Sequence, residues 1–112
     1  MKYALLIHSN DEQWDERSEN EQRSIQGEYM AISELPGMFG GAQLEPATST
    51  TTVRVADGRT LATDGPFAET KEALGGFYLF EAPNLDDAIE VAARIPAARF
   101  GGAVEVRPLV ER

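Results

Sequence analysis

The chain of 112 residues contains no cysteine and a single histidine, His8. Without cysteine it can form neither a disulfide framework nor a thiolate nucleophile, and zinc could be held only through nitrogen and oxygen ligands. The sequence also has no histidine pair, no glycine-rich phosphate loop and no Gly-x-Ser-x-Gly motif. We therefore expect no resident metal or cofactor, and nucleotide, zinc-dependent and serine hydrolysis are poor matches.

Basic residues are also scarce. Ten Lys and Arg stand against 19 Asp and Glu, which gives a net charge of -9. Such a charge repels phosphate backbones and anionic lipid, so we expect no nucleic-acid and no membrane partner. The apolar run from Tyr3 to Ile7 is far shorter than the roughly 18 residues of a transmembrane helix, and no signal-peptide pattern follows it. We expect a soluble cytoplasmic protein.

The hydrophobic pattern predicts one domain over residues 1–112. Its first strand, Tyr3 to Ile7, is apolar at every position, so both of its faces should be covered. A helix should follow from Ser18 to Leu35, because Ser18 and Glu21 form a capping box before an apolar stripe. The segment Met38 to Leu44 reads as a glycine-bearing strand.

A hairpin and a second strand-helix-strand unit complete the pattern. Asp57-Gly58 predicts a two-residue turn that pairs Val55 with Thr60 and Val53 with Ala62. Gly75 to Ala82 reads as a central strand, and Asn84 as the N-cap of a helix. The buried stripe expected for that helix is Leu85, Ala88, Ile89 and Ala92. A last strand should run from Ala103 to about Leu109.

This order of elements predicts an α+β fold: two βαβ units with a β-hairpin insertion, arranged as a ferredoxin-like antiparallel sheet. Both helices then lie on one face of the sheet, and the other face is bare. A bare face of apolar side chains would be an exposed patch of a size that monomers avoid. We therefore expect a homodimer, in which two sheets pack face to face.

Three motifs support a family resemblance that covers nearly the whole chain. They are Asp64-Gly65-Pro66-Phe67, Ile95-Pro96-Ala97-Ala98-Arg99 and Val104-Glu105-Val106-Arg107-Pro108. Together they resemble the DGPF branch of the YCII-related proteins. The resemblance implies a dimeric α/β barrel with clefts beside the dimer interface, in a family whose members mostly have no assigned function.

His8 and Asp64 are the candidate catalytic residues. His8 ends the first strand on the face of Ala4 and Leu6, and a histidine side chain suits proton transfer at neutral pH. Asp64 stands at the exit of the hairpin and could act as a base or orient His8. Each also has a purely structural interpretation: His8 bonded to a loop carbonyl, and Asp64 accepting backbone N–H groups of its own turn.

The resemblance bears on this pair. YCII-related proteins outside the DGPF branch have a histidine on the first helix and an aspartate as candidate catalytic residues. In this chain Gln26 falls near the position of that histidine, and a glutamine side chain does not serve as a base. The resemblance therefore does not transfer the catalytic pair.

Four residues are candidates for ligand binding: Gln26, Tyr29, Lys71 and Arg99. Tyr29 lies on the buried helix stripe, where core packing competes with a hydroxyl that reaches a cleft. Lys71 could attract an anion or belong to a solvated face. Arg99 could pair with Glu105 or bind a carboxylate ligand. Trp14, in an acidic connector, is either a lid over a cleft or a satellite core residue.

Three functions follow. The first is a homodimer that binds a compact organic ligand, with cofactor-free proton transfer as lyase or isomerase chemistry in a cleft with His8, Asp64 and Tyr29. The second is a non-catalytic sensing or interaction module, because relatives of this branch resemble proteins linked to alternative sigma factors. The third is a scaffold without a ligand.

Overall fold

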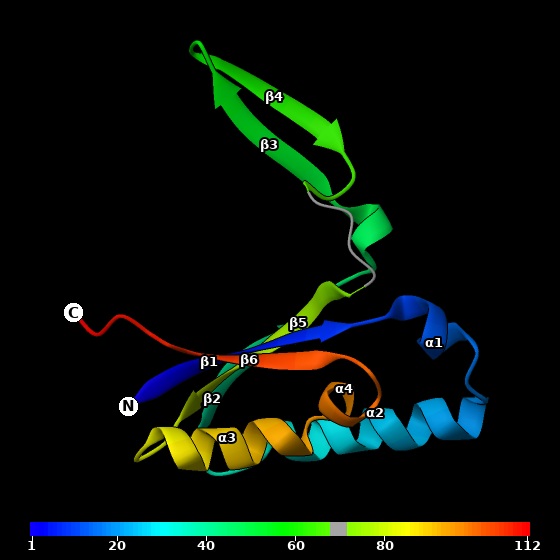
Figure 1. Ribbon diagram of the computed structural model, residues 1–112, viewed down its shortest axis with the longest axis vertical. Coiled ribbons are helices and arrows are strands. Elements are labelled where there is room, and N and C mark those ends of the chain that lie inside the picture. Colours follow the sequence, from blue (N-terminus) through cyan, green and yellow to red (C-terminus); the bar gives the residue numbers. More distant parts are fainter. Residues whose placement is uncertain (68–71) are drawn as a thin grey trace.

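The computed structural model describes residues 1–67 and 72–112 of the chain. Four strands form an antiparallel sheet in the order β2-β5-β1-β6, and two more form a separate hairpin, β3-β4 (Figure 1). The strands are β1 Lys2–Ser9, β2 Met38–Gln43, β3 Thr51–Ala56, β4 Arg59–Asp64, β5 Ala73–Glu81 and β6 Ala103–Pro108. The helices are α1 Asp11–Asp15, α2 Glu19–Ser33, α3 Leu85–Arg94 and α4 Pro96–Arg99, with a 3-10 turn, η1, at Ala47–Ser49.

The predicted ferredoxin-like α+β fold is confirmed. All strand pairs of the larger sheet are antiparallel, with β5 and β1 in the centre and β2 and β6 at the edges. The helices α2 and α3 lie on the same face of the sheet (Figure 1). This placement explains the apolar Tyr3, Leu5 and Ile7 of β1, which face the helices, whereas Ala4 and Leu6 belong to the other face, which none of the described elements covers.

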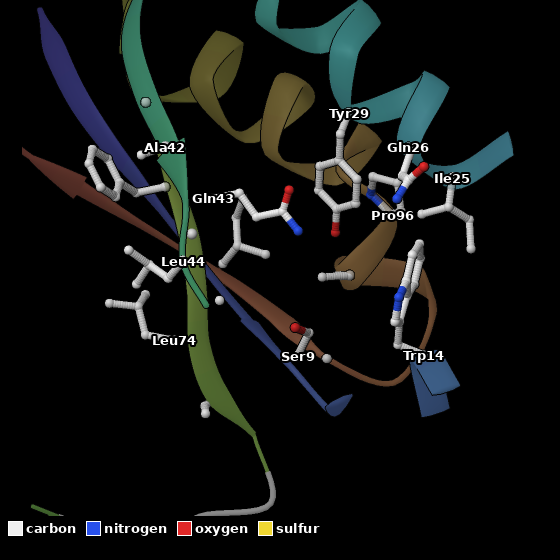
Figure 2. Close-up of a pocket in the computed structure, with 18 of the residues that line it drawn as sticks. Ser9, Trp14, Ile25, Gln26, Tyr29, Ala42, Gln43, Leu44, Leu74 and Pro96 are labelled. Carbon is white, nitrogen blue, oxygen red and sulfur yellow. The ribbon is translucent and has the colours of Figure 1, made fainter. Parts of the chain in front are cut away.

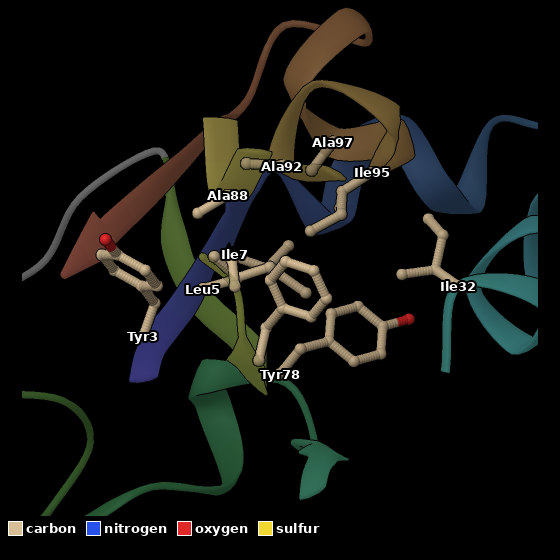
Figure 3. Packing of buried hydrophobic residues seen from close by; sticks show 11 residues of the cluster. Tyr3, Leu5, Ile7, Ile32, Tyr78, Ala88, Ala92, Ile95 and Ala97 are labelled. Carbon is tan, nitrogen blue, oxygen red and sulfur yellow. The ribbon is translucent and has the colours of Figure 1, made fainter. Parts of the chain in front are cut away.

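The hydrophobic core lies between the sheet and the two long helices (Figure 3). Tyr3 and Leu5 of β1 and Ile95 after α3 are fully buried. The rest of the core cluster is Ile7, Ile32, Tyr78, Phe80, Ala82, Ala88, Ala92 and Ala97. The small alanines of α3 let that helix pack closely on the aromatic side chains of the sheet.

The buried stripe of α3 differs from the one predicted. Ala88 and Ala92 are buried as expected, but Leu85 and Ile89 are each 48% exposed. The stripe runs instead through Ala88, Ala92 and Ile95, which are spaced i, i+4 and i+7 and so share one side of the helix. The spacing of apolar residues in the sequence is compatible with both sets, and packing against the sheet determines which set is buried.

Both predicted N-caps are present. The Ser18 hydroxyl accepts a hydrogen bond of 3.2 Å from the Glu21 N–H, and the Asn84 side chain accepts one of 2.9 Å from the Asp87 N–H. These bonds satisfy backbone donors that a helix leaves without partners in its first turn. Among the helices of the described residues, none has the length and apolar character needed to cross a membrane.

The hairpin forms the arm of the molecule, residues 51–64. Its register pairs Val55 with Thr60 and Val53 with Ala62, as predicted. Asp57 and Gly58 have φ values of 52° and 75°, so the turn is of the mirror-image kind that twists with the strands. The arm projects from the sheet (Figure 1), and the Cα radius of gyration is 15.9 Å, where a compact chain of this length has about 13 Å.

The bare face of the sheet carries apolar side chains at its centre. Leu6 of β1 lies opposite Phe77 of β5, and Leu79 lies beside it on the same parity, away from the buried Tyr78 and Phe80. None of the described elements covers this face (Figure 1). The sheet thus presents an apolar surface of the kind that pairing of two copies would cover.

Candidate functional site

A pocket of about 790 Å³ opens between α2 and the sheet, and its lining continues past the β2 edge to Phe77, whose side chain is on the bare face. Its walls come from α2, from α1 and the connector after it, and from the adjoining ends of β1, β2 and β5 (Figure 2). The segment from α4 to Gly102 forms the remaining side. Its lining includes the aromatic residues Trp14, Tyr29, Phe77, Tyr78 and Phe100 and the aliphatic residues Ile7, Ile25, Met30, Leu44 and Leu74.

Several uncharged polar side chains line this pocket, among them Tyr29, Gln43 and Ser9. The Tyr29 hydroxyl points into the space, the Gln43 amide is directed towards it, and the Ser9 hydroxyl lies at the lower side (Figure 2). Burial raises the pKa of Tyr29, while a backbone hydrogen bond from Ala97 and the charge of Arg99 oppose the rise. Tyr29 is therefore a neutral hydroxyl at physiological pH, able to donate or accept a hydrogen bond.

The only tryptophan, Trp14, stands at one side of the pocket (Figure 2). Gln22 of α2 fixes the segment that carries it. The Gln22 Nε2 donates 3.0 Å to the Trp14 carbonyl and 3.4 Å to the Arg17 carbonyl. The Arg17 N–H also donates 3.1 Å to the Trp14 carbonyl. Trp14 thus belongs to a hydrogen-bonded wall of the pocket.

Tyr78 joins the core to the pocket. Its hydroxyl donates 2.7 Å to the Tyr29 carbonyl, which links β5 to α2. Burial, with the nearby Tyr29, raises the pKa of Tyr78 from 10.0 to about 12. The unfolded chain therefore loses this proton at lower pH than the folded chain, and stability present below pH 10 is lost as the pH rises through about 12.

The Tyr78→Phe variant tests this link. We expect wild-type protein to lose stability towards urea between pH 9 and pH 11, as the unfolded tyrosine ionises first. Tyr78→Phe should lose less over the same interval, because phenylalanine has no proton to release. Unfolding followed by Trp14 fluorescence at both pH values measures the difference. An equal loss in both proteins would contradict the assignment.

His8 lies on the bare face of the sheet and does not line the pocket. Its Nε2 is 2.5 Å from Glu105 Oε1 on the neighbouring strand β6. Arg107 lies 3.8 Å from the other oxygen of the same carboxylate. His8 therefore has a carboxylate partner in the structure, but this partner is Glu105 and not Asp64.

Asp64 is the last residue of β4 and pairs with Thr51 across the hairpin. The turn after it is held at Gly65, whose N–H donates 2.7 Å to the Thr50 carbonyl and whose carbonyl accepts 2.7 Å from the Thr52 hydroxyl. His8 and Asp64 are both described, and no hydrogen bond or ion pair joins them within the chain. The structure does not bring the two catalytic candidates together in one protomer.

The ligand-binding candidates divide. Gln26 and Tyr29 both line the pocket. Arg99 does not line it: its Nη2 is 2.6 and 2.5 Å from the two carboxylate oxygens of Glu28, so the predicted alternative of a pair with Glu105 is wrong. Lys71 lies outside the described residues.

Sequence reasoning did not identify Ser9, Arg17 and Gln43 as pocket residues. Each is polar and stands next to the end of a predicted element: Ser9 after the first strand, Arg17 before the helix N-cap, Gln43 near the end of the second strand. Polar residues at the ends of predicted strands and helices are candidates for a binding site, but the sequence does not show which of these ends lie close together in the fold. Within the described part of the chain, no three His, Asp or Glu side chains are grouped to hold a metal ion.

The fold and the pocket together define a small ferredoxin-like α+β domain with a ligand-sized space between its first long helix and its sheet. The chain belongs to the YCII-related family, whose domain model matches residues 1–112. An uncharacterized protein of Rhizobium meliloti is 40% identical over 118 residues, covering 97% of this chain and 92% of that protein.

Proposed function

We propose that this protein is a homodimer that binds a compact organic ligand in the pocket between α2 and the sheet. The observation that carries the proposal is the pocket itself: about 790 Å³, mostly apolar, with Tyr29, Gln43 and Ser9 as convergent polar groups. Ligand sites in proteins have volumes of roughly 300–1,000 Å³ and this same mixture of apolar lining with few polar groups.

The lining favours binding over catalysis. Its titratable side chains, among the described residues, are Arg17, Tyr29, Glu45 and Tyr78. Burial keeps both tyrosines protonated at neutral pH, so neither is a ready base. Proton transfer by His8 and Asp64 stays a prediction for a location outside this pocket. There His8, paired with Glu105, would be the base.

The homodimer is supported by the bare face of the sheet. Leu6, Phe77 and Leu79 form an uncharged apolar centre that none of the described elements covers. A two-fold axis through this centre would place the same side chains of two copies against each other. The resemblance to the DGPF branch implies the same face-to-face pairing.

Gln43→Phe tests the pocket. Gln43 is exposed on an edge strand and its side chain is directed towards Tyr29, so phenylalanine would fill the space without disturbing the core (Figure 2). A panel of small aromatic and aliphatic amides, alcohols and acids, followed by Trp14 fluorescence, should contain ligands of the wild-type protein. We expect Gln43→Phe to bind these at least about ten-fold more weakly.

Glu90→Phe is the matched control, since it adds the same ring on the exposed side of α3 and does not line the pocket. It should bind the same fragments as wild type. If no fragment perturbs Trp14, or if Gln43→Phe binds as tightly as the control, the proposed function is wrong.

The arm favours a second candidate, a protein-interaction module of the kind linked to alternative sigma factors. Val53 and Val55 share one face of the hairpin and are 60% and 71% exposed. An isolated two-stranded hairpin is marginally stable in water, so we expect another protein surface to pack against this face. That surface belongs either to the second copy of this chain or to a different protein.

The double substitution Val53→Thr and Val55→Thr distinguishes between these two partners. Threonine keeps the β-branched shape and the strand preference but removes apolar surface. If the arm embraces the second copy, dimer dissociation measured by analytical ultracentrifugation should become easier. An unchanged dimer would assign the arm to a different partner.

A further inference from the structure

Arg17 is the one basic side chain in the described lining of the pocket, and Glu45 is the one acidic side chain. Their settings differ. The side chain of Arg17 is only 20% exposed, whereas Glu45 is an exposed residue of the loop after β2. Water screens an exposed charge far more than a largely buried one. The electrostatic character of the pocket is therefore set by Arg17.

The guanidinium of Arg17 is held in place but not neutralised at short range. It stacks 4.4 Å from the centre of the Phe100 ring, which also lines the pocket. Among the carboxylates of the described residues, it pairs with that of Glu21, at 3.9 Å and itself 62% exposed. A contact of that length is an ion pair without a good hydrogen bond. Arg17 therefore keeps N–H donors for another group.

Arg99 provides an internal comparison. It stacks on the same Phe100 ring, at 4.7 Å, but its Nη2 bonds both oxygens of Glu28 at 2.6 and 2.5 Å. Its charge is thus matched within the chain, and it does not line the pocket. Of the two arginines on this ring, only Arg17 combines access to the pocket with a loosely held carboxylate.

We propose that the ligand of this pocket is an organic monocarboxylate with a flat apolar body, whose carboxylate is bound by the Arg17 guanidinium. The proposal rests on the proposed function, that the pocket binds a small ligand. The planar fork of a guanidinium matches the two oxygens of a carboxylate. The body lies against Trp14, Ile25 and Phe100, which supply the apolar wall beside Arg17.

A single cation also limits the choice of anion. A phosphate carries nearly two charges and three acceptor oxygens, and would leave one charge unmatched in a chain of net charge -9. One largely buried guanidinium balances one carboxylate. A monoanion is therefore the better match.

The isosteric pair phenylacetate and phenylacetamide tests the proposal on the full-length protein. Both have the same body and differ in one charge. We expect wild-type protein to bind phenylacetate about ten-fold or more tightly than phenylacetamide, because hydrogen bonds to charged groups are the stronger ones. The dissociation constants come from amide chemical shifts in NMR titrations, which also show where each compound binds.

Arg17→Met keeps the aliphatic stem over Phe100 and removes the charge. It should abolish the preference for the acid, so that phenylacetate and phenylacetamide bind within about two-fold of each other. Arg99→Met removes the other guanidinium from the same ring and should keep the preference. A preference that survives Arg17→Met, or one absent from wild type, overturns the proposal.

The two proposals fail in different ways. If phenylacetamide binds at the pocket but phenylacetate is no tighter, the carboxylate assignment is wrong and the ligand pocket stands. If neither compound shifts pocket residues, and the wider fragment panel also gives no ligand, the pocket itself is not a binding site. Tighter binding of inorganic phosphate than of phenylacetate would also overturn the carboxylate assignment.

Discussion

Leu79→Asp is expected to convert the proposed homodimer into monomers. Leu79 lies at the middle of the central strand β5, opposite Ala4 on one side and Gly40 on the other, and faces the bare side of the sheet. A two-fold interface there would bury one new carboxylate from each copy, and the cost of removing these charges from water opposes association. We expect the dimer dissociation constant to rise by about a hundred-fold or more.

Sedimentation equilibrium measures this change, and Ile89→Asp is its matched control. Ile89 is 48% exposed on α3, on the opposite side of the sheet, so the same kind of substitution there should leave the dimer intact. Far-ultraviolet circular dichroism should show a folded protein in both cases. A Leu79→Asp protein that remains as dimeric as wild type would contradict pairing through this face.

Leu5→Ala is expected to cause the largest loss of stability. Leu5 is fully buried in the middle of β1, between Tyr78 of β5 and Val106 of β6. Removing most of its side chain loses apolar burial and leaves a cavity that the packed sheet cannot close. The free energy of unfolding should fall by about 2–5 kcal/mol.

Leu85→Ala makes the same chemical change at a side chain that is 48% exposed, and should cost less than about 1 kcal/mol. Urea unfolding of wild type and both variants at one protein concentration gives the comparison, since dimerisation makes stability depend on concentration. Similar losses at Leu5 and Leu85 would mean that the core is not where the structure places it.

The sequence predicts the fold well because its local signals agree with one another. The caps at Ser18 and Asn84, the turn at Asp57-Gly58 and the two apolar parities of the central strands all point to the same topology. The exception is the stripe of α3. There Leu85 and Ile89 fit a helix period as well as Ile95 does, and only contact with the sheet decides between them.

The site is less predictable, because a pocket depends on which element ends meet in space. Gln26 and Tyr29 could be named from their helix, but nothing local shows that Gln43 and Arg17 face the same space. His8 is a catalytic candidate because histidine can transfer protons at neutral pH, yet in the structure it pairs with Glu105 on the bare face of the sheet. The type of a residue indicates which chemistry it could perform, but only the fold shows whether it lies in the pocket.

The most direct test of the central claim is to find where a bound ligand touches the protein. Intermolecular nuclear Overhauser effects from phenylacetate, or from the best fragment of the panel, would report this in solution. The ligand should show contacts to the Trp14 indole and the Tyr29 ring, which both line the pocket on the helix side. Contacts to His8 and Leu6 on the bare face, with none to Trp14 or Tyr29, would contradict the claim.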